Sequence, residues 1–459
     1  MRTLLINPPW FSRKENIWHD ISSVLPPLGL AWLATALERR GHDVHILDAH
    51  AERLDFGTLV SRIREMGRFQ YVGITATTSL IANALEIARA IRAEFPEIRI
   101  ILGGVHPTVL PAEVLAEPAV DIVVRGEGEQ TIVELVEDKP LDTVSGISFR
   151  ENGCVVHTPD RPLIKDIDSL GIPAYHLLPM HRYYPATGAS KRLPATSMLS
   201  TRGCPGKCTF CYRLFGHRLR ARSGHIVAEE VKYLQDRYNI REVAFYDDTF
   251  TAFKREVFSF CQGVEDLKID LTWSCFSRVD SVTEELLQVM KDTGLHQIMY
   301  GIESSSNEIL QNINKRFNTE QVENVIQMTK RIGIDVRAAF MLGNPGETEH
   351  TMKDTLDFAK RLNPEIAVFN ITTPYPGTEM FNWADENGYL LTKDWEQYDL
   401  THPVMELPTV SAVKVKEFYD QVYRKFYLRP EYISMRLRKI RSITDLNEVF
   451  QGMQAVIGV

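Results

Sequence analysis

Hydrophobic and polar positions along the first 130 residues follow two alternating periods. Short apolar runs that suit buried strands are separated by segments with apolar residues at helical spacing. The runs predicted as strands are 3–7, 44–47, 71–75, 98–102 and 122–125, and the helical segments include 28–40 and 82–94. Because alternating strands and helices with short connections form doubly wound parallel sheets, we expect such an α/β domain over residues 1–145.

Polar residues and glycines follow these predicted strands directly. They are Asn7, Thr75, Thr77, Thr78, Ser79, Gly103, Gly104, His106, Gly126 and Glu127. The carboxyl edge of an open parallel sheet is where ligands bind, and adjacent glycines let a ligand approach the backbone closely. A single turn of this kind would indicate only a tight turn. Their recurrence on one edge indicates a ligand site.

A hairpin and a proline-rich stretch come next. Asn152-Gly153 stands between two short apolar runs, a pattern typical of a β-hairpin. Prolines then recur from 162 to 194, which is typical of a connection between domains. We expect residues 146–194 to form a hairpin and a linker.

The strand–helix alternation resumes in residues 195–400. The predicted strands are 196–200, 242–246, 271–277, 297–302, 336–342 and 367–372. Each is followed by polar residues or glycines, as at the carboxyl ends of the strands in β/α barrels. We predict a partial (β/α)6 TIM-like barrel here and a helical C-terminal segment over residues 401–459.

Three of the six cysteines lie close together, directly after the first predicted barrel strand. Cys204, Cys208 and Cys211 have the spacing Cys-x3-Cys-x2-Cys, and Pro205 and Gly206 disfavour a helix between them. Thiolates on such a loop suit an iron–sulfur cluster or zinc. A structural zinc would need a fourth protein ligand, for which His217 is the candidate. Three cysteines on a four-iron cluster would instead leave one iron open to a reacting molecule.

Composition narrows the class of protein. The chain has 459 residues, 24% of them charged, and a net charge of -8, so it lacks the basic character of a nucleic-acid-binding protein. No apolar run reaches 18 residues, and the N-terminus lacks a secretory signal pattern, so we expect no membrane span. With too few cysteines for a disulfide scaffold, a cytoplasmic location is expected.

Together these motifs resemble the cobalamin-binding branch of the radical S-adenosylmethionine (SAM) superfamily. About the first 135 residues are similar to its cobalamin-binding domain, flavodoxin-like in fold, through Asn7-Pro8-Pro9, Gly103–Thr108 and Gly126–Glu129. Residues 195–400 resemble its barrel through the cysteine spacing and through segments such as Gly-Ile-Glu-Ser-Ser-Ser.

The chain departs from the Asp-x-His-x-x-Gly motif in which a histidine ligates cobalt. His45 follows Asp43 at the right spacing, but Asp48 replaces the glycine, and His45 falls inside a predicted strand. We therefore expect cobalt without histidine on its lower face, and the loop 77–80 beneath it. His106 is a weaker candidate ligand.

The resemblance implies three cofactors: a [4Fe-4S] cluster on the three cysteines, SAM on its open iron, and cobalamin. It implies that SAM is held by Phe210, Asp247, Asp248, Arg278, Glu303, Gly343 and Glu347. It also implies a small-molecule substrate and an external electron donor of the flavodoxin or ferredoxin type. We expect methylation of an unactivated carbon or phosphorus through a 5′-deoxyadenosyl radical and methylcobalamin. The alternatives are a cyclising, rearranging or oxidising enzyme and, with less support, a cobalamin-responsive binding protein.

The C-terminal segment contains an aromatic helical pattern at 413–428 and a basic amphipathic one at 433–443. A helix packed on the barrel is the commoner arrangement, and contact with a membrane surface is the alternative. Because a radical must be shielded from water, we expect the aromatic helix to help enclose a substrate held between the two domains.

Overall fold

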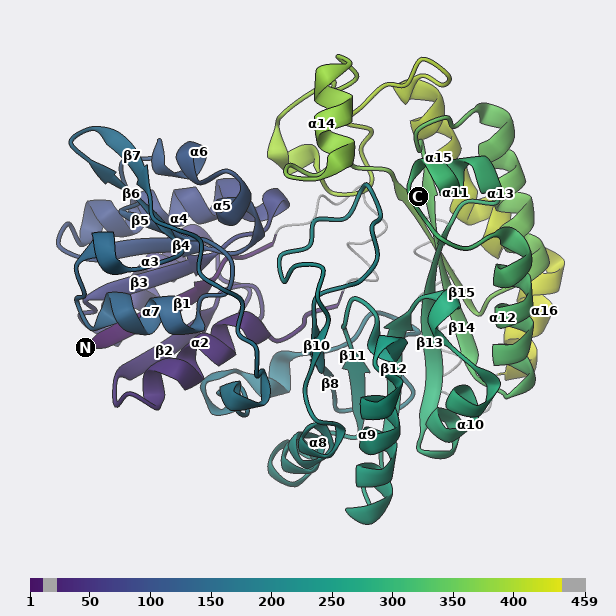
Figure 1. Cartoon of the computed structure of the whole chain (residues 1–459), viewed down its shortest axis with the longest axis horizontal. Helices are drawn as coiled ribbons and strands as arrows, with labels where there is room; N and C mark the ends of the chain where they lie inside the picture. Colours follow the sequence, from purple (N-terminus) through teal and green to yellow (C-terminus); the bar gives the residue numbers. More distant parts are fainter. Residues whose placement is uncertain (11–22, 440–459) are drawn as a thin grey trace.

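The computed structural model describes residues 1–10 and 23–439, which form two α/β units side by side (Figure 1). The first unit contains a seven-stranded sheet of order β2-β1-β3-β4-β5-β6-β7. Its parallel strands are β1 (Arg2–Asn7), β2 (Asp43–Asp48), β3 (Tyr71–Thr75), β4 (Arg99–Gly103) and β5 (Ile122–Val124). The predicted doubly wound α/β unit is confirmed.

Helices cover both faces of this sheet. They are α2 (Leu28–Glu38), α3 (Phe56–Met66), α4 (Ile81–Glu94), α5 (Val105–Val109), α6 (Pro111–Leu115) and α7 (Glu129–Val136). Alternate residues of β1 belong to different cores: Leu5 packs in the core with α2 and α7, whereas Leu4 and Ile6 pack in the core with α3 and α4. The sheet is thus buried on both sides, as a parallel sheet requires.

The hairpin belongs to this sheet, whereas the sequence predicted that it forms part of the connection between the two domains. Strands β6 (Ile147–Glu151) and β7 (Cys154–His157) form as expected, but β6 pairs antiparallel with β5 and so extends the sheet. Sequence patterns reveal a hairpin locally, but not the edge on which it docks. The connection between the units therefore begins after His157.

The second unit is an open half-barrel of six parallel strands in sequential order. They are β8 (Ala195–Met198), β11 (Glu242–Phe245), β12 (Thr272–Ser277), β13 (Leu295–Glu303), β14 (Asp335–Leu342) and β15 (Ile366–Ile371). The helices that follow are α8 (Gly224–Tyr238), α9 (Lys254–Asp266), α10 (Glu284–Asp292), α11 (Asn307–Asn312), α12 (Thr319–Arg331), α13 (Glu349–Leu362) and α14 (Glu379–Glu386). All six predicted barrel strands are present.

The C-terminal helices cover the free edge of β15 instead of the mouth of the barrel. They are α15 (Ala412–Tyr427) and α16 (Pro430–Lys439). The Tyr423 hydroxyl binds the amide and carbonyl of Phe369 at 3.1 and 2.8 Å, and the Tyr427 hydroxyl binds those of Ala367 at 2.9 and 2.8 Å. The expectation that this aromatic helix encloses a substrate between the domains is therefore corrected. Its hydroxyls satisfy the unpaired edge of the half-barrel. The end of the basic segment at 433–443 lies outside the described residues.

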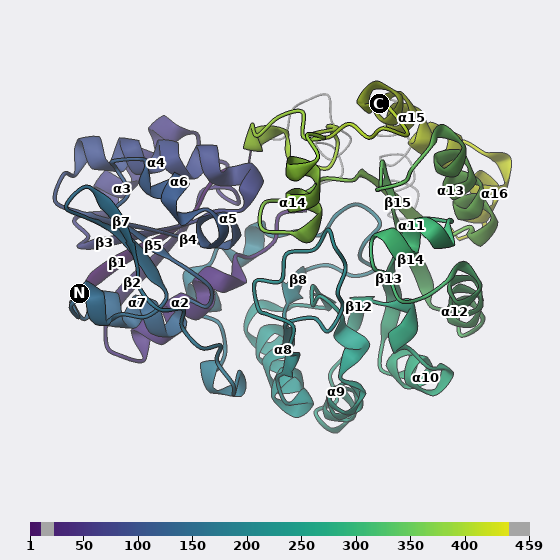
Figure 2. The same ribbon diagram turned by 45° about the horizontal axis from the view of Figure 1, so that its top comes forward.

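The two units touch through the last loops of the barrel. Trp395, in the turn η8 (Trp395–Gln397), donates a hydrogen bond of 2.6 Å to Glu113 of α6. A Cβ atom at Gly377 would lie 2.7 Å from Val109 of α5, so the chain before α14 runs directly against the first unit. Figure 2 shows α14 between the two units. Within the described part of the chain, no helix is long and apolar enough to cross a membrane.

Candidate functional site

The cysteine loop, residues 203–218, leaves and re-enters the barrel through a short ribbon. β9 (Thr201–Arg202) pairs antiparallel with β10 (Arg220–Ala221) at its base. Gly203 has a φ of 90°, and a Cβ atom there would lie 2.5 Å from the Arg218 carbonyl oxygen, so only glycine fits. The loop therefore starts from a fixed backbone position at the carboxyl end of β8.

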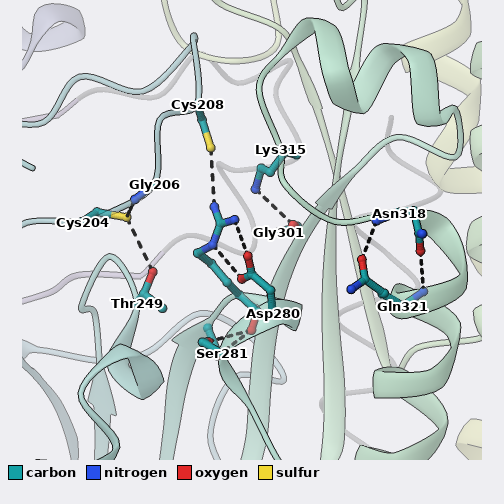
Figure 3. A network of polar contacts seen from close by, with 12 residues as sticks. Cys204, Gly206, Cys208, Thr249, Asp280, Ser281, Gly301, Lys315, Asn318 and Gln321 are labelled. Atoms are coloured by element: carbon teal, nitrogen blue, oxygen red, sulfur yellow. Dashed lines mark hydrogen bonds and ion pairs between the residues drawn. The ribbon is translucent and has the colours of Figure 1, made fainter.

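Hydrogen-bond donors face the sulfur atoms of this loop (Figure 3). The Gly206 amide lies 3.4 Å from Cys204 Sγ, and Arg278 Nη1 lies 3.7 Å from Cys208 Sγ. Desolvation raises the pKa of the Cys211 thiol to about 11, and Asp248 adds to the rise.

A connected set of side chains surrounds the cysteine loop. Lys315 Nζ lies 2.8 Å from Glu303 Oε1 and 3.1 Å from the Gly301 carbonyl, and it also lies over the Phe210 and Phe317 rings. Arg278 lies over the same Phe317 ring and pairs with Asp280. The structure thus brings three predicted residues, Phe210, Arg278 and Glu303, to one side of the loop.

The carboxyl end of β13 places special requirements on Gly301 and Glu303. Glu303 has a φ of 71°, which residues other than glycine rarely adopt, and its side chain is buried. A Cβ atom at Gly301 would lie 2.6 Å from Glu303 Oε1, so the glycine makes room for the ion pair with Lys315. Strain of this kind gathers at ligand sites.

A cavity, here called the edge cavity, lies at the carboxyl edge of the first sheet. Its volume is about 1060 Å³, including space open to solvent. The first unit contributes the predicted residues Thr75, Thr77, Gly103, Gly104, Gly126 and Glu127. The second unit contributes Leu199, Arg202, Leu214 and Phe215, the last two from the cysteine loop. The cavity is therefore shared by both units.

Comparisons with known proteins agree with this arrangement. A model of the B12 binding domain matches residues 17–136, and a model of the Radical SAM superfamily matches residues 198–359. The chain is 37% identical over 440 residues to an uncharacterised methyltransferase of Pyrococcus horikoshii, with 94% of each chain covered. The chain belongs to the B12-binding radical SAM family.

More distant members have the same fold. The chain is 28% identical over 455 residues to the anaerobic magnesium-protoporphyrin IX monomethyl ester cyclase of Rubrivivax gelatinosus, covering 96% of this chain and 80% of the cyclase. The radical SAM methyltransferase TsrM of Kitasatospora setae, solved with cobalamin and a [4Fe-4S] cluster bound, matches with a TM-score of 0.72 at 16% identity. That match covers 99% of this chain and 98% of TsrM.

The donor set of the cysteine loop fits the cluster of this family better than zinc. Among the described residues, no three His, Cys, Asp or Glu side chains converge closely enough to hold one metal ion. A tetrahedral zinc needs such convergence, whereas in a [4Fe-4S] cluster each cysteine binds a different iron. His217, the candidate fourth zinc ligand, instead contacts Arg213 Nη1 at 3.4 Å.

The walls of the edge cavity fit a large flat cofactor such as cobalamin. Gly104 has a φ of 104°, and a Cβ atom there would lie 2.6 Å from the Ala76 carbonyl oxygen. His45 lies within β2 as expected, where it contacts Asp43 and Arg2, away from the carboxyl edge. In the predicted lower-face loop, Thr77 lines the cavity and is exposed.

Four predicted cobalamin residues are placed elsewhere. Asn7 donates to Asp48 at 2.9 Å, and Thr78 and Ser79 lie in the turn η1 (Thr78–Leu80), outside the cavity lining. His106 is fully buried against Trp395, with a ring distance of 5.4 Å, and its burial lowers its pKa. His106 therefore packs between the units and does not reach the cavity, which corrects its assignment.

Two predicted SAM residues are buried in structural roles. Oδ1 of Asp247 accepts hydrogen bonds from the backbone and hydroxyls of Ser200 and Thr201, and the side chain is 0% exposed. Glu347, also 0% exposed, accepts from Asn344 and Thr351. Both carboxylates fix turns at strand ends and cannot touch a ligand directly. Their neighbours Asp248 and Gly343 remain candidates.

A buried ionic network joins the two units beneath the edge cavity. Arg202 lies 2.9 Å from Glu127 and 2.5 Å from Glu129, and Arg220 lies 2.9 Å from Glu127. The Arg202 guanidinium also lies over the rings of Trp32 and Phe215, each at 5.0 Å. Because Arg202 is two residues before Cys204, this network ties the cobalamin-binding unit to the cysteine loop.

Sequence reasoning missed several of these residues. Lys315 and Arg220 lie outside the recognised motifs, and Arg202 lies within one but had no predicted role. The roles of all three depend on contacts 12 to 93 residues apart in the chain. One signal was available for Arg202, since a charged residue directly before a buried ligand loop needs a partner. For Lys315 the sequence offers no such signal.

Proposed function

We propose that this chain is a cobalamin-dependent radical SAM methyltransferase acting on an unactivated carbon or phosphorus. The observation that carries the proposal is the edge cavity, whose walls come from both the cobalamin-binding unit and the cysteine loop. A methyl donor in that cavity faces the loop that would hold the cluster and SAM. The methyltransferase of Pyrococcus horikoshii supports this reading by its name and its matched length.

The residues of the chain bind the cofactors, orient them and shield them from water. When bound, the cluster and SAM supply a 5′-deoxyadenosyl radical, and methylcobalamin supplies the methyl group. Cys204, Cys208 and Cys211 would hold the cluster. Asp248, Arg278 and Gly343, together with the Glu303–Lys315 pair, would hold the polar groups of SAM, and Phe210 its adenine. Thr75, Thr77 and the glycines of the edge cavity would hold cobalamin.

We further propose that a flavodoxin- or ferredoxin-type protein in the cytoplasm supplies electrons. The cysteine loop is reachable from outside, because Cys211 is exposed and Cys204 is half-buried. A reducing compartment keeps such thiols available for a cluster.

Methyl transfer can be tested without the substrate. The full chain, reconstituted with iron, sulfide and cobalamin and then reduced, is incubated with SAM labelled at its methyl group. We expect S-adenosylhomocysteine in the mixture and the label on cobalamin. Cys208→Ala should stop formation of 5′-deoxyadenosine, because the cluster would lack a ligand.

The outcomes separate the function classes. A cyclase-like enzyme would give 5′-deoxyadenosine without S-adenosylhomocysteine, and that result would overturn the proposed methylation. A binding protein would give neither product. The magnesium-protoporphyrin cyclase of Rubrivivax gelatinosus makes the first of these alternatives worth separating.

A further inference from the structure

A second cavity, here called the barrel cavity, lies inside the half-barrel. Its volume is about 530 Å³, including space open to solvent. Apolar or aromatic side chains form most of its wall, among them Leu25, Ala244, Phe276 and Met299. The linker closes one side, because Tyr183, Pro185 and Ala189 also line the cavity. The wall of this cavity is therefore mainly apolar.

One arginine, Arg337 of β14, also lines this cavity. Its Nε atom is buried without a hydrogen-bond partner. Across the described residues, its guanidinium has neither a hydrogen bond nor an ion pair. Burying the Nε atom of a guanidinium without a partner is costly, because water no longer solvates that atom.

Two other polar residues of the cavity, Glu242 and Gln297, are already engaged. Glu242 accepts from the amides of Lys191 and Arg192, from Thr272 and from His296, all within 2.8 Å. Gln297 donates to the Gly188 carbonyl at 3.3 Å. Glu242 is therefore committed to holding the linker and β13, and its charge is shared with His296. Neither residue serves as the counter-charge of Arg337.

We propose that Arg337 binds an oxyanion of the substrate, a carboxylate or a phosphate group, inside the barrel. A guanidinium presents two parallel N–H groups that match either oxyanion, and the apolar wall takes the rest of the molecule. This assignment rests on the proposed function, since it names the class of substrate that the methyltransferase would accept.

The strand register gives the distance between the anchor and the chemistry. Arg337 pairs with Met299, and Met299 with Phe276, so these three side chains form one layer. Glu303, beside the cysteine loop, lies four residues further along β13. At about 3.3 Å per residue, that is roughly 13 Å toward the carboxyl end. The substrate class is therefore an elongated, mainly apolar molecule with an oxyanion at one end.

Binding of simple probes tests the assignment directly. Octanoate, octyl phosphate and octanol are titrated into the full chain, with cluster and cobalamin loaded, and followed by calorimetry. We expect at least one of the two anions to bind, and octanol to bind at least tenfold more weakly. Arg337→Gln should weaken anion binding about ten- to hundredfold, the range for a hydrogen bond to a charged group. Arg337→Lys should retain part of the affinity.

A matched control is Arg331→Gln, which removes the same side chain from an exposed position at the end of α12. It should bind the probes as the unchanged chain does. The preference between the two anions tells whether the oxyanion is a carboxylate or a phosphate. Equal anion affinity in Arg337→Gln, or octanol binding as tight as that of the anions, would overturn the assignment.

Failure of the proposed methyltransferase function and failure of the Arg337 assignment give different results, because they are measured separately. The probes are read by heat of binding, and methyl transfer by label on cobalamin. A chain that binds octanoate through Arg337 but forms no S-adenosylhomocysteine keeps the anion site and loses the methyltransferase. The opposite result keeps the methyltransferase and removes Arg337 from substrate binding.

Discussion

The interface between the two units and the interior of the barrel hold arginines in opposite ways. At the interface, Arg202 meets two glutamates and two aromatic rings, and all of these groups come from the chain itself. In the barrel, Arg337 meets no acid among the described residues. A cation whose partners are all present is a structural element, whereas a cation without one indicates a ligand.

Asp247 stands between these two cases. It is fully buried, and one of its oxygens accepts four hydrogen bonds from neutral donors, but Oδ2 has no partner in the described part of the chain. Among the described residues, charge meets counter-charges at the interface, neutral donors at Asp247, and neither a hydrogen bond nor an ion pair at Arg337. Substitutions at these three sites should separate structural charges from charges that await a ligand.

The largest effect is expected at the interface. Arg202→Met leaves Glu129 without its charged partner and Glu127 with Arg220 and the Ile164 amide. Breaking a buried ion pair by removing one side costs about 3–5 kcal/mol. Urea denaturation of the full chain should therefore show a loss of that size in the free energy of unfolding.

The matched control for Arg202 is a surface pair. Arg192 makes two contacts to the carboxylate of Asp270, which is 80% exposed. Arg192→Met should cost no more than about 1 kcal/mol. Equal losses in the two variants would show that the interface network is no more than a solvated ion pair.

The next effect is a pH dependence at Asp247. Burial raises the pKa of Asp247 to about 6, even though Thr201 and Ser200 favour the ionised form. The folded chain then holds the proton more tightly than the unfolded chain does. Stability from this group is present at low pH and is lost as the pH rises from about 4 to about 6.

Asp247→Asn should remove that loss. A rise of about two pKa units corresponds to roughly 3 kcal/mol, so the variant should gain on the unchanged chain by up to that amount between pH 4 and pH 6. The measurement is the difference between the two free energies of unfolding across this pH range. Parallel curves would mean that the four donors already balance the charge.

A smaller effect is expected at the outer edge of the barrel, where neutral groups are paired. Tyr427→Phe leaves the amide and carbonyl of Ala367 without their partner. An unsatisfied buried group costs about 1–3 kcal/mol, which urea denaturation resolves. Tyr184→Phe is the control, because that side chain is 39% exposed. If both variants were equally stable, α15 would not serve as the cap of this edge.

The difference between local patterns and contacts distant in the chain explains how much of the fold and of the site could be predicted from the sequence. Hydrophobic periods located the strands of both sheets, because each buried strand must be apolar whatever its neighbours are. The cysteine spacing predicts a metal site for the same local reason. The docking of the hairpin on β5 and of α15 on β15 depends on partners distant in the chain, and no local pattern encodes those partners. The sequence correctly indicates that Asp247 and Glu347 lie at strand ends. It suggested that their carboxylates face SAM, whereas in the structure they accept hydrogen bonds within their own turns.

The smallest change in the free energy of unfolding is expected at Arg337. Whether that free energy rises or falls decides if Arg337 has a counter-charge within the chain. Arg337→Met replaces a cation that has no partner among the described residues by an apolar side chain of similar length, in a cavity lined mainly by apolar groups. Since no favourable pair is lost, the free energy of unfolding should stay constant or rise by up to about 1 kcal/mol. Proteins keep such a charge when binding requires it, so the same variant should lose its affinity for the anionic probe. A loss of stability comparable to that of Arg202→Met would show that Arg337 has a counter-charge within the chain, and the contrast between the two arginines would disappear.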